Sequence, residues 1–218
     1  MPRLLIDTDA YVRLGYGDCL KELCGRLGAS WEDCRHLPAL PHQLSRGALA
    51  RKLGPERAAT LRSKLAGLRP LATVAGAAAD DLAPINDMDA GEVQLFAAAA
   101  ADPECLVVTN DKRAIHALSQ APHVAASLAG RVVLTGPALI ELLDAMGVDW
   151  VRNQLAGIQD IDTALVVCFS PGNPSPGESL SNYLQGDLKT MPPRVLWLPA
   201  SQTGGQGPMG GGTSPSSS

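Results

Sequence analysis

Three acidic residues far apart in the chain stand where a parallel sheet could bring them together. Asp7 follows the short apolar run Leu4–Ile6, and Asp111 follows the run CLVVT at residues 105–109. Glu92 lies near the start of an Ala-rich segment that precedes this second run. Because the carboxyl ends of parallel strands gather along one edge of a sheet, we expect the three carboxylates to share one cavity. Grouped carboxylates repel each other and favour Mg²⁺ or Mn²⁺, ions that activate water and stabilise phosphoryl displacement.

The segments around these acids alternate between expected strands and expected helices. Strands are predicted at residues 4–6, 105–109 and 131–135, each a continuous apolar run typical of a buried parallel strand. Helices are predicted at residues 18–27, 42–53, 55–68, 90–101, 112–119, 136–146 and 148–169. Residues 70–86 indicate a loop or short irregular helix, and residues 194–198 a late strand or an extended packing segment. The alternation predicts an α/β three-layer sandwich with a central, mostly parallel sheet.

The chain divides into three expected segments. Residues 1–146 carry the α/β pattern, and residues 147–199 form a helical C-terminal extension. Residues 200–218 are rich in Gly, Ser and Pro, and we expect a disordered tail there. No apolar run approaches the ~20 residues of a membrane span, and the N-terminus lacks the pattern of a signal peptide. We therefore expect a cytoplasmic protein without membrane association.

Basic residues concentrate in the first part of a chain whose net charge is −4. Residues 1–75 hold 12 Lys and Arg against 7 Asp and Glu, whereas the rest holds 6 against 15. Between Arg46 and Arg69 there are seven basic residues and one acid, Glu56. This surface indicates either a phosphate-binding face or an ordinary solvated helix surface. Aromatic residues make up only 4% of the chain, which argues against a base-stacking platform.

Four segments, taken in order, resemble the PIN-domain family of metal-dependent ribonucleases. They read LLIDTDAYV, DMDAGEVQLFAAAA, CLVVTNDKRAI and RVVLTGPALIELL, and together they cover about residues 3–146. The resemblance implies a PIN-like fold that hydrolyses RNA phosphodiester bonds with metal-activated water. It implies Asp7, Glu92 and Asp111 as catalytic metal ligands, Asp89 as a further ligand, and Asp9 as a supplementary acid.

The same resemblance implies partners. RNA is the expected substrate, and the cofactor is expected to be Mg²⁺ or Mn²⁺. Bacterial relatives often serve as toxins held by an antitoxin, so an antitoxin-like protein partner is implied, and a homodimer stays open. Thr109 or Asn110 is expected to orient a ligand or bind phosphate. The residues expected to contact nucleic acid are Arg46, Arg51, Lys52, Arg62, Asn110 and Lys112.

One departure from the family pattern affects the predicted activity. The family places another acid in a segment that here reads LPALPHQLSRGALARKL, and this segment contains no Asp or Glu. The expected position falls near Ser45 or Arg46. Two outcomes stay open: another acid substitutes, or the site is weakened. The acids considered as substitutes are Glu22, Glu32 and Asp33. A degenerate PIN-like module that binds nucleic acid or protein without cleavage is therefore the alternative.

Simpler roles also account for some of these residues. Asp89 and Glu92 have the spacing of a helix capping box, and Asp111 or Asn110 could be the N-cap of the next helix. Asp7 is harder to explain this way, because an acid directly after a buried strand is costly unless it is paired or coordinated. Asp7-Thr8-Asp9 also resembles the first motif of haloacid-dehalogenase-type phosphatases, but the later motifs of that family occur here in the wrong order.

The five cysteines are irregularly spaced and include no CxxC pair. Cys19, Cys24, Cys34 and His36 fit no common pattern of structural zinc sites. We expect buried thiols rather than a metal site or disulfides.

Overall fold

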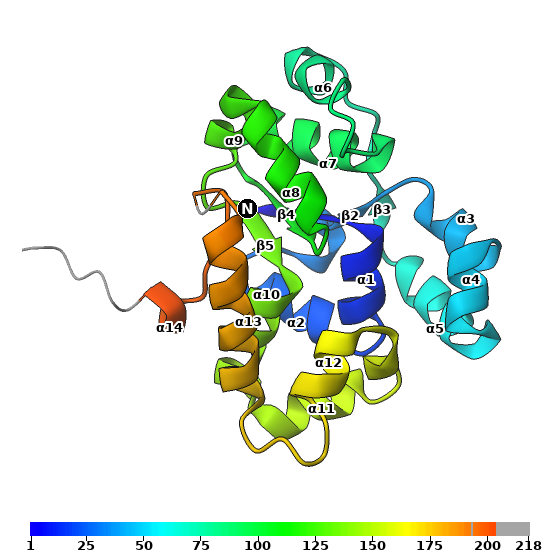
Figure 1. The fold of residues 1–218 in the computed structure, drawn as a ribbon. Helices are drawn as coiled ribbons and strands as arrows, with labels where there is room; N and C mark the ends of the chain where they lie inside the picture. Colours follow the sequence, from blue (N-terminus) through cyan, green and yellow to red (C-terminus); the bar gives the residue numbers. More distant parts are fainter. Residues whose placement is uncertain (193, 204–218) are drawn as a thin grey trace, which may run out of the picture.

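The computed structural model describes residues 1–192 and 194–203 and places a five-stranded, all-parallel sheet at the centre of the molecule (Figure 1). The order of the strands across the sheet is β3-β2-β1-β4-β5. They are β1 (Arg3–Ile6), β2 (Arg35–His36), β3 (Arg69–Pro70), β4 (Cys105–Thr109) and β5 (Val132–Leu134). Helices cover both faces of the sheet, so the predicted α/β three-layer class is confirmed.

The three predicted strands form the centre and one edge of the sheet. β1 pairs in parallel with β4, with Leu5 opposite Val107 and Ile6 opposite Val108, and β5 pairs with the other side of β4. Strands β2 and β3 were not expected from the sequence. Each has only two residues, and Arg-His and Arg-Pro carry no apolar strand signal, so they form only because they pair with β1 and with each other.

Helices follow the strands on both faces. In the first part of the chain they are α1 (Thr8–Gly15), α2 (Cys19–Arg26), α3 (Leu40–Ser45), α4 (Ala48–Leu53), α5 (Pro55–Leu65), α6 (Ala77–Leu82), α7 (Ala90–Ala101), α8 (Lys112–Ala117), α9 (Pro122–Ser127) and α10 (Thr135–Met146). The C-terminal extension contains α11 (Val148–Leu155), α12 (Thr163–Cys168) and α13 (Pro176–Thr190), and α14 (Ala200–Thr203) follows it. Short 3₁₀ turns are η1 (Trp31–Asp33), η2 (Leu118–Gln120) and η3 (Gln159–Ile161).

Several predicted helices are correct and others are divided. α7 has the predicted bounds, whereas the helix predicted at residues 42–53 is interrupted at Gly47, whose φ of 93° ends the run. The helix predicted at residues 148–169 is divided by η3 into α11 and α12. Residues 70–86, predicted as a loop or short irregular helix, contain the short helix α6, whereas α9 and α13 were not predicted as helices of their own.

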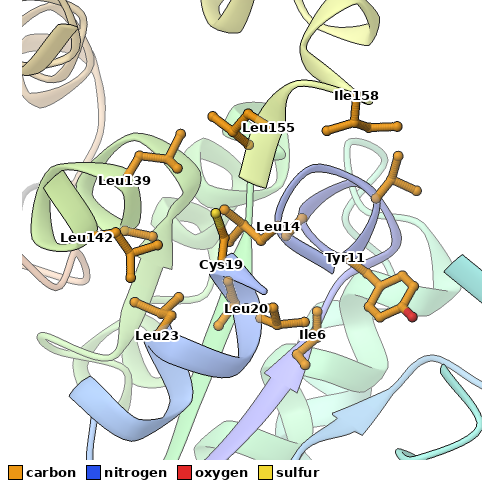
Figure 2. Packing of buried hydrophobic residues seen from close by; sticks show 14 of the residues in the cluster. Ile6, Tyr11, Leu14, Cys19, Leu20, Leu23, Leu139, Leu142, Leu155 and Ile158 are labelled. Atoms are coloured by element: carbon orange, nitrogen blue, oxygen red, sulfur yellow. The ribbon is translucent and has the colours of Figure 1, made fainter. Parts of the chain in front are cut away.

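The apolar residues form two clusters, one on each face of the sheet. In β1, Leu4 and Ile6 belong to one cluster and Leu5 to the other, as the alternation of side chains along a strand requires. The first cluster includes residues of α1, α2, α10 and the extension, and Figure 2 shows Ile6 near Leu20 and Tyr11. The Tyr11 hydroxyl donates a hydrogen bond to the Leu61 carbonyl at 2.7 Å, which ties α1 to α5.

The C-terminal extension shares its core with the rest of the molecule. Leu155 and Ile158 belong to the first cluster, and Figure 2 shows Leu155 close to Leu139 of α10. Near the end of the described chain, residues 194–198 run beside β5, where the Trp197 N–H donates to the Val132 carbonyl at 2.8 Å. The first residues of the expected tail form α14, and residues 204–218 lie outside the described residues.

All five cysteines are buried and free, as expected. The sulfur atoms of Cys24 and Cys34 lie 3.0 Å apart as a thiol pair. His36 is buried next to Leu37, whose carbonyl oxygen lies 2.8 Å from the His36 ring Nδ1.

Candidate functional site

A cavity of about 500 Å³ opens near the carboxyl ends of β1 and β4. The chain leaves β1 toward β2 on one side, while β4 lies on the other side, so this is the point where the strand order reverses. Ligands of open parallel sheets bind in the crevice at such a switch point. The carboxylates that line the cavity are those of Asp7, Asp9, Asp89, Glu92 and Asp111. The structure therefore brings the predicted acids to one cavity.

Asp7 is buried at the end of β1, where it caps α1. Its Oδ1 accepts a hydrogen bond from the Thr8 N–H at 2.6 Å, and its Oδ2 accepts one from the Thr109 hydroxyl at 3.1 Å. Burial raises the pKa of the Asp7 carboxyl to about 6, and the nearby charges of Asp9 and Asp89 add to this rise. Asp7 therefore holds a negative charge at neutral pH that the protein environment disfavours.

Glu92 is also buried, with 8% of the residue exposed. Its Oε2 accepts a hydrogen bond from the Asp89 N–H at 2.7 Å, and Asp89 in turn accepts from the Glu92 N–H, which completes the predicted capping box. Burial raises the pKa of the Glu92 carboxyl to about 7, and the adjacent carboxyl of Asp111 raises it further by hydrogen bonding and repulsion. Glu92 thus both completes the capping box of α7 and lines the acidic cavity.

Asp111 caps α8 and belongs to the same polar network. Its Oδ1 accepts hydrogen bonds from the backbone N–H groups of Arg113 and Ala114, and the Arg113 guanidinium lies 3.3 Å from its Oδ2. Although burial opposes ionisation, these contacts and the hydrogen bond from Glu92 hold the Asp111 pKa below its usual value. The Thr109 hydroxyl accepts from the Asp111 N–H at 3.1 Å while it donates to Asp7. Thr109 therefore positions two of the acids.

The residue that faces this cavity from α3 is Gln43. Its Oε1 lies 3.2 Å from the Thr8 hydroxyl, which donates to it. Ser45 and Arg46, near which the fourth acid was expected, line a different cavity. No local pattern in the sequence indicates Gln43, because the start of α3 after a two-residue strand sets which residue faces the acids. The acids considered as substitutes do not line the cavity, and they are Glu22, Glu32 and Asp33.

The residues expected to bind nucleic acid separate into two groups. Arg46, Arg51 and Arg62 line one cavity between α4 and α5, and Lys52 is not part of its lining. Asn110 and Lys112 line another cavity beneath the C-terminal extension, where Lys112 pairs with Asp187 of α13. The structure therefore does not bring the six residues together on one surface.

The donor set of the acidic cavity fits a hard divalent cation in its chemistry. It consists of carboxylate oxygens, and two of the carboxyls have raised pKa values. Within residues 1–192 and 194–203, however, no group of three or more His, Cys, Asp or Glu side chains is placed so that it could hold a metal ion. Asp7, Asp89 and Asp111 direct oxygens to backbone N–H groups at the starts of α1, α7 and α8. These acids line one cavity without forming a closed set of ligands.

Comparison with known proteins gave no match to any family model, curated protein or solved structure. In the part of the chain that the structure describes, no helix is both long enough and apolar enough to span a membrane. Fold and site together define a class: an open, all-parallel α/β protein with a carboxylate-lined cavity at its topological switch point.

Proposed function

We propose that this protein is a PIN-like endoribonuclease that uses Mg²⁺ or Mn²⁺ bound in the acidic cavity. The observation that carries the proposal is the convergence of five carboxylates on one cavity at the carboxyl edge of β1 and β4. Burial, and to a smaller extent repulsion among these groups, raises the pKa values of Asp7 and Glu92, and a bound cation would offset both effects. The four segments with PIN-like order support the same conclusion.

Each residue has a defined part in this proposal. Asp7, Glu92 and Asp111 would hold the ion, with Asp89 at the rim, while Thr109 keeps Asp7 and Asp111 in place through its two hydrogen bonds. A divalent ion held there would supply an activated water and would stabilise charge on the phosphoryl group. In the reaction, water adds across a P–O bond of the RNA backbone, which leaves one phosphate monoester end and one hydroxyl end. The proposal places the protein in the cytoplasm, with an antitoxin-like protein as its partner.

The experiment that tests this proposal is RNA cleavage with Mn²⁺ or Mg²⁺ and with chelator. We expect cleavage that requires the metal and falls at least about a hundredfold in Asp7→Asn and in Asp111→Asn, since each removes a charged ligand. Asp144→Asn is the matched control, because Asp144 is an exposed acid on α10, outside the cavity. Metal-dependent cleavage that survives both site substitutions would contradict the proposed site.

Gln43 favours a second candidate function, an RNA-binding PIN-like module without cleavage. The side chain of Gln43, a neutral amide, faces the carboxylates from α3. The cavity therefore has one negative charge fewer than it would have with an acid at position 43. Under this candidate, wild type binds RNA but does not cleave it with either metal. The Gln43→Glu variant tests the difference, because an added carboxylate should strengthen Mn²⁺ binding about tenfold or more. Calorimetric titration of both proteins with Mn²⁺ measures it, and equal affinities would show that position 43 is not part of the metal site.

A further inference from the structure

A second cavity, of about 530 Å³, lies between α4 and α5 and is lined by three arginines. Arg46 lies at the end of α3, Arg51 in α4 and Arg62 in α5, and no acidic residue is part of the lining. The rest of the lining is mostly small, and includes Gly47, Ala50 and other Ala and Gly positions. Small side chains leave the guanidinium groups room to turn into the hollow, where a flat, forked donor can bind a phosphate with two hydrogen bonds.

Helices α4 and α5 form a basic helical hairpin. The cations on one of its faces have acidic partners, and the cations on the other face have none among the described residues. On one face, Arg57 pairs with Asp160 at 2.9 Å and Lys64 pairs with Asp18 at 3.1 Å. On the other face, the three arginines of the cavity make no ion pair with any described residue. Ion pairs thus neutralise Arg57 and Lys64, which join the hairpin to the rest of the molecule. The three arginines that line the cavity have no such counter-charge within the part of the chain that the structure describes.

Like charges that share a hollow without a counter-charge raise the local positive potential. Such a potential attracts a polyanion even though the whole chain carries a net charge of −4. The lining contains no aromatic side chain on which a base could stack. The chemistry of this cavity therefore fits backbone phosphates rather than nucleobases.

The position of this cavity relates it to the acidic one. The two cavities lie on either side of the short helix α3, since Gln43 lines the acidic cavity while Leu44, Ser45 and Arg46 line the basic one. Figure 1 shows α3, α4 and α5 gathered at one side of the molecule, next to α1. Consecutive residues of this segment thus line the two cavities, so the cavities are neighbours on the molecule.

We propose that Arg46, Arg51 and Arg62 bind backbone phosphates of an RNA whose reacting bond lies in the acidic cavity. This inference rests on the proposed function and adds to it an anchor outside the reaction centre. Recognition through phosphates alone makes this contact independent of base sequence.

The test is binding of a fluorescently labelled single-stranded RNA of about a dozen nucleotides to the full chain, measured by anisotropy with chelator present. The site variant is Arg46→Gln/Arg62→Gln. The matched control is Lys52→Gln/Arg69→Gln, which removes the same charge from exposed positions of the same segment outside the cavity. We expect the site variant to bind roughly tenfold more weakly and its salt dependence, log K against log salt, to become shallower by about 1.4. The control should change affinity much less.

Two results would overturn the inference. One is an equal loss in both double variants, which would show a general charge effect. The other is RNA binding by wild type that inorganic tripolyphosphate abolishes at concentrations comparable to the RNA, which would assign the cavity to free phosphates. Circular dichroism and thermal unfolding of both variants confirm that a loss of binding is not a loss of folding.

The inference and the proposed function fail separately, because binding is measured without metal. If the arginines are needed for RNA binding but no metal supports cleavage, the phosphate-binding role of the arginines is supported and the proposed hydrolysis is refuted. If cleavage occurs, a dinucleotide substrate should be cut equally by wild type and the site variant, whereas the KM for the longer strand should rise in the variant. An unchanged KM for the longer strand contradicts the anchor and leaves the hydrolysis intact.

Discussion

At the scale of single residues, the acids of the cavity have both a structural and a proposed chemical role. Asp89 and Glu92 form the capping box that their spacing predicts, and Asp111 caps α8. Asp7 also caps α1, which the sequence did not indicate. These caps do not exclude a metal site, because they hold the carboxylates at helix starts beside the same cavity. The raised pKa values of Asp7 and Glu92 show that hydrogen bonds alone do not offset their burial.

The raised pKa of Asp7 predicts how its removal changes stability with pH. The folded-state pKa of about 6 lies above the ordinary 3.8, so Asp7 favours the folded state below pH 3.8 and loses this effect as pH rises through 6. With chelator present, Asp7→Asn should therefore gain stability relative to wild type as pH rises, by up to roughly 3 kcal/mol between pH 4 and pH 8. Urea unfolding of both proteins at several pH values measures this difference.

Addition of Mn²⁺ should reverse that comparison at pH 8, because the ion stabilises the folded wild type and not the variant. The matched control is again Asp144→Asn, which should follow wild type across the same pH range. A difference between wild type and Asp7→Asn that does not depend on pH would contradict the raised pKa of Asp7.

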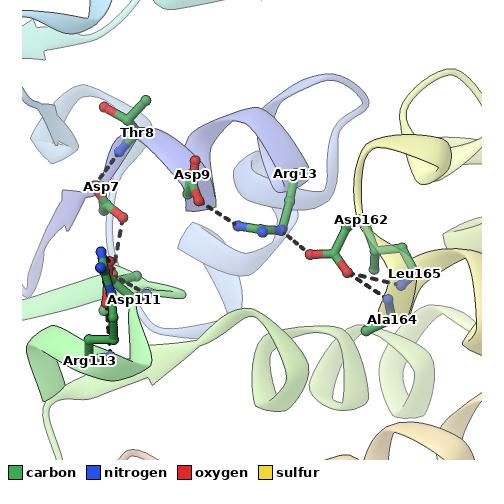
Figure 3. Close-up of polar contacts among 10 residues, drawn as sticks. Asp7, Thr8, Asp9, Arg13, Asp111, Arg113, Asp162, Ala164 and Leu165 are labelled. Atoms are coloured by element: carbon green, nitrogen blue, oxygen red, sulfur yellow. Dashed lines mark hydrogen bonds and ion pairs between the residues drawn. The ribbon is translucent and has the colours of Figure 1, made fainter. Parts of the chain in front are cut away.

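At the scale of secondary structure elements, the ion pair of Arg13 and Asp162 joins α1 to the C-terminal extension. The Arg13 Nε lies 2.6 Å from an Asp162 carboxylate oxygen, and both side chains are only 14% exposed. Figure 3 shows Arg13 between Asp9 and Asp162, and Asp162 also caps α12 through the N–H groups of Ala164 and Leu165. The pair therefore fixes the extension next to α1, the helix that follows β1.

We predict that Asp162→Ala lowers the free energy of unfolding by roughly 3 kcal/mol, because it leaves the buried Arg13 with only its longer contact to the exposed Asp9 and removes a helix cap. Asp160→Ala is the control, since the Asp160 carboxylate is largely exposed and pairs with Arg57 at the surface. It should change stability by less than about 1 kcal/mol. Chemical denaturation measures both variants, and equal losses would show that the buried pair has no special role.

At the scale of the whole molecule, the reactivity of the buried cysteines can show whether the two apolar clusters unfold together. Cys19, Cys24, Cys34 and Cys168 belong to the first cluster, and Cys105 belongs to the second, on the other face of the sheet. Burial raises the pKa of Cys19 to about 12 and that of Cys105 to about 11, and the hydrogen bond with Cys34 together with burial raises the pKa of Cys24 strongly. Thiols that are protonated and buried react slowly.

We predict that native protein at pH 8 takes up iodoacetamide at none of the five cysteines on a timescale of minutes, and at all five after denaturation. Because both layers share the central sheet, the slow native labelling should proceed at one common rate. Mass spectrometry of peptides after timed labelling measures the rate at each cysteine. Much faster labelling of Cys105 than of Cys24 would show that the two layers open separately.

The sequence alone predicted the elements whose signal is local. β1 and β4 are continuous apolar runs, α7 has high helix propensity with a capping box at its start, and the acids that follow or precede them are therefore placed at one edge of a parallel sheet. This was enough to predict the fold class and the convergence of Asp7, Glu92 and Asp111. Local burial and capping decide these features, so distant residues are not needed to find them.

Only the tertiary structure decided which other side chains face the site. β2 and β3 have no strand signal; β2 forms by pairing with β1, and β3 by pairing with β2. The orientation of α3 after β2 places Gln43 at the acids and Arg46 at the neighbouring cavity. The extension in turn covers Lys112 with Asp187. These outcomes depend on contacts between segments far apart in the chain, because the phase of a short helix is set by what it packs against and not by its own six residues.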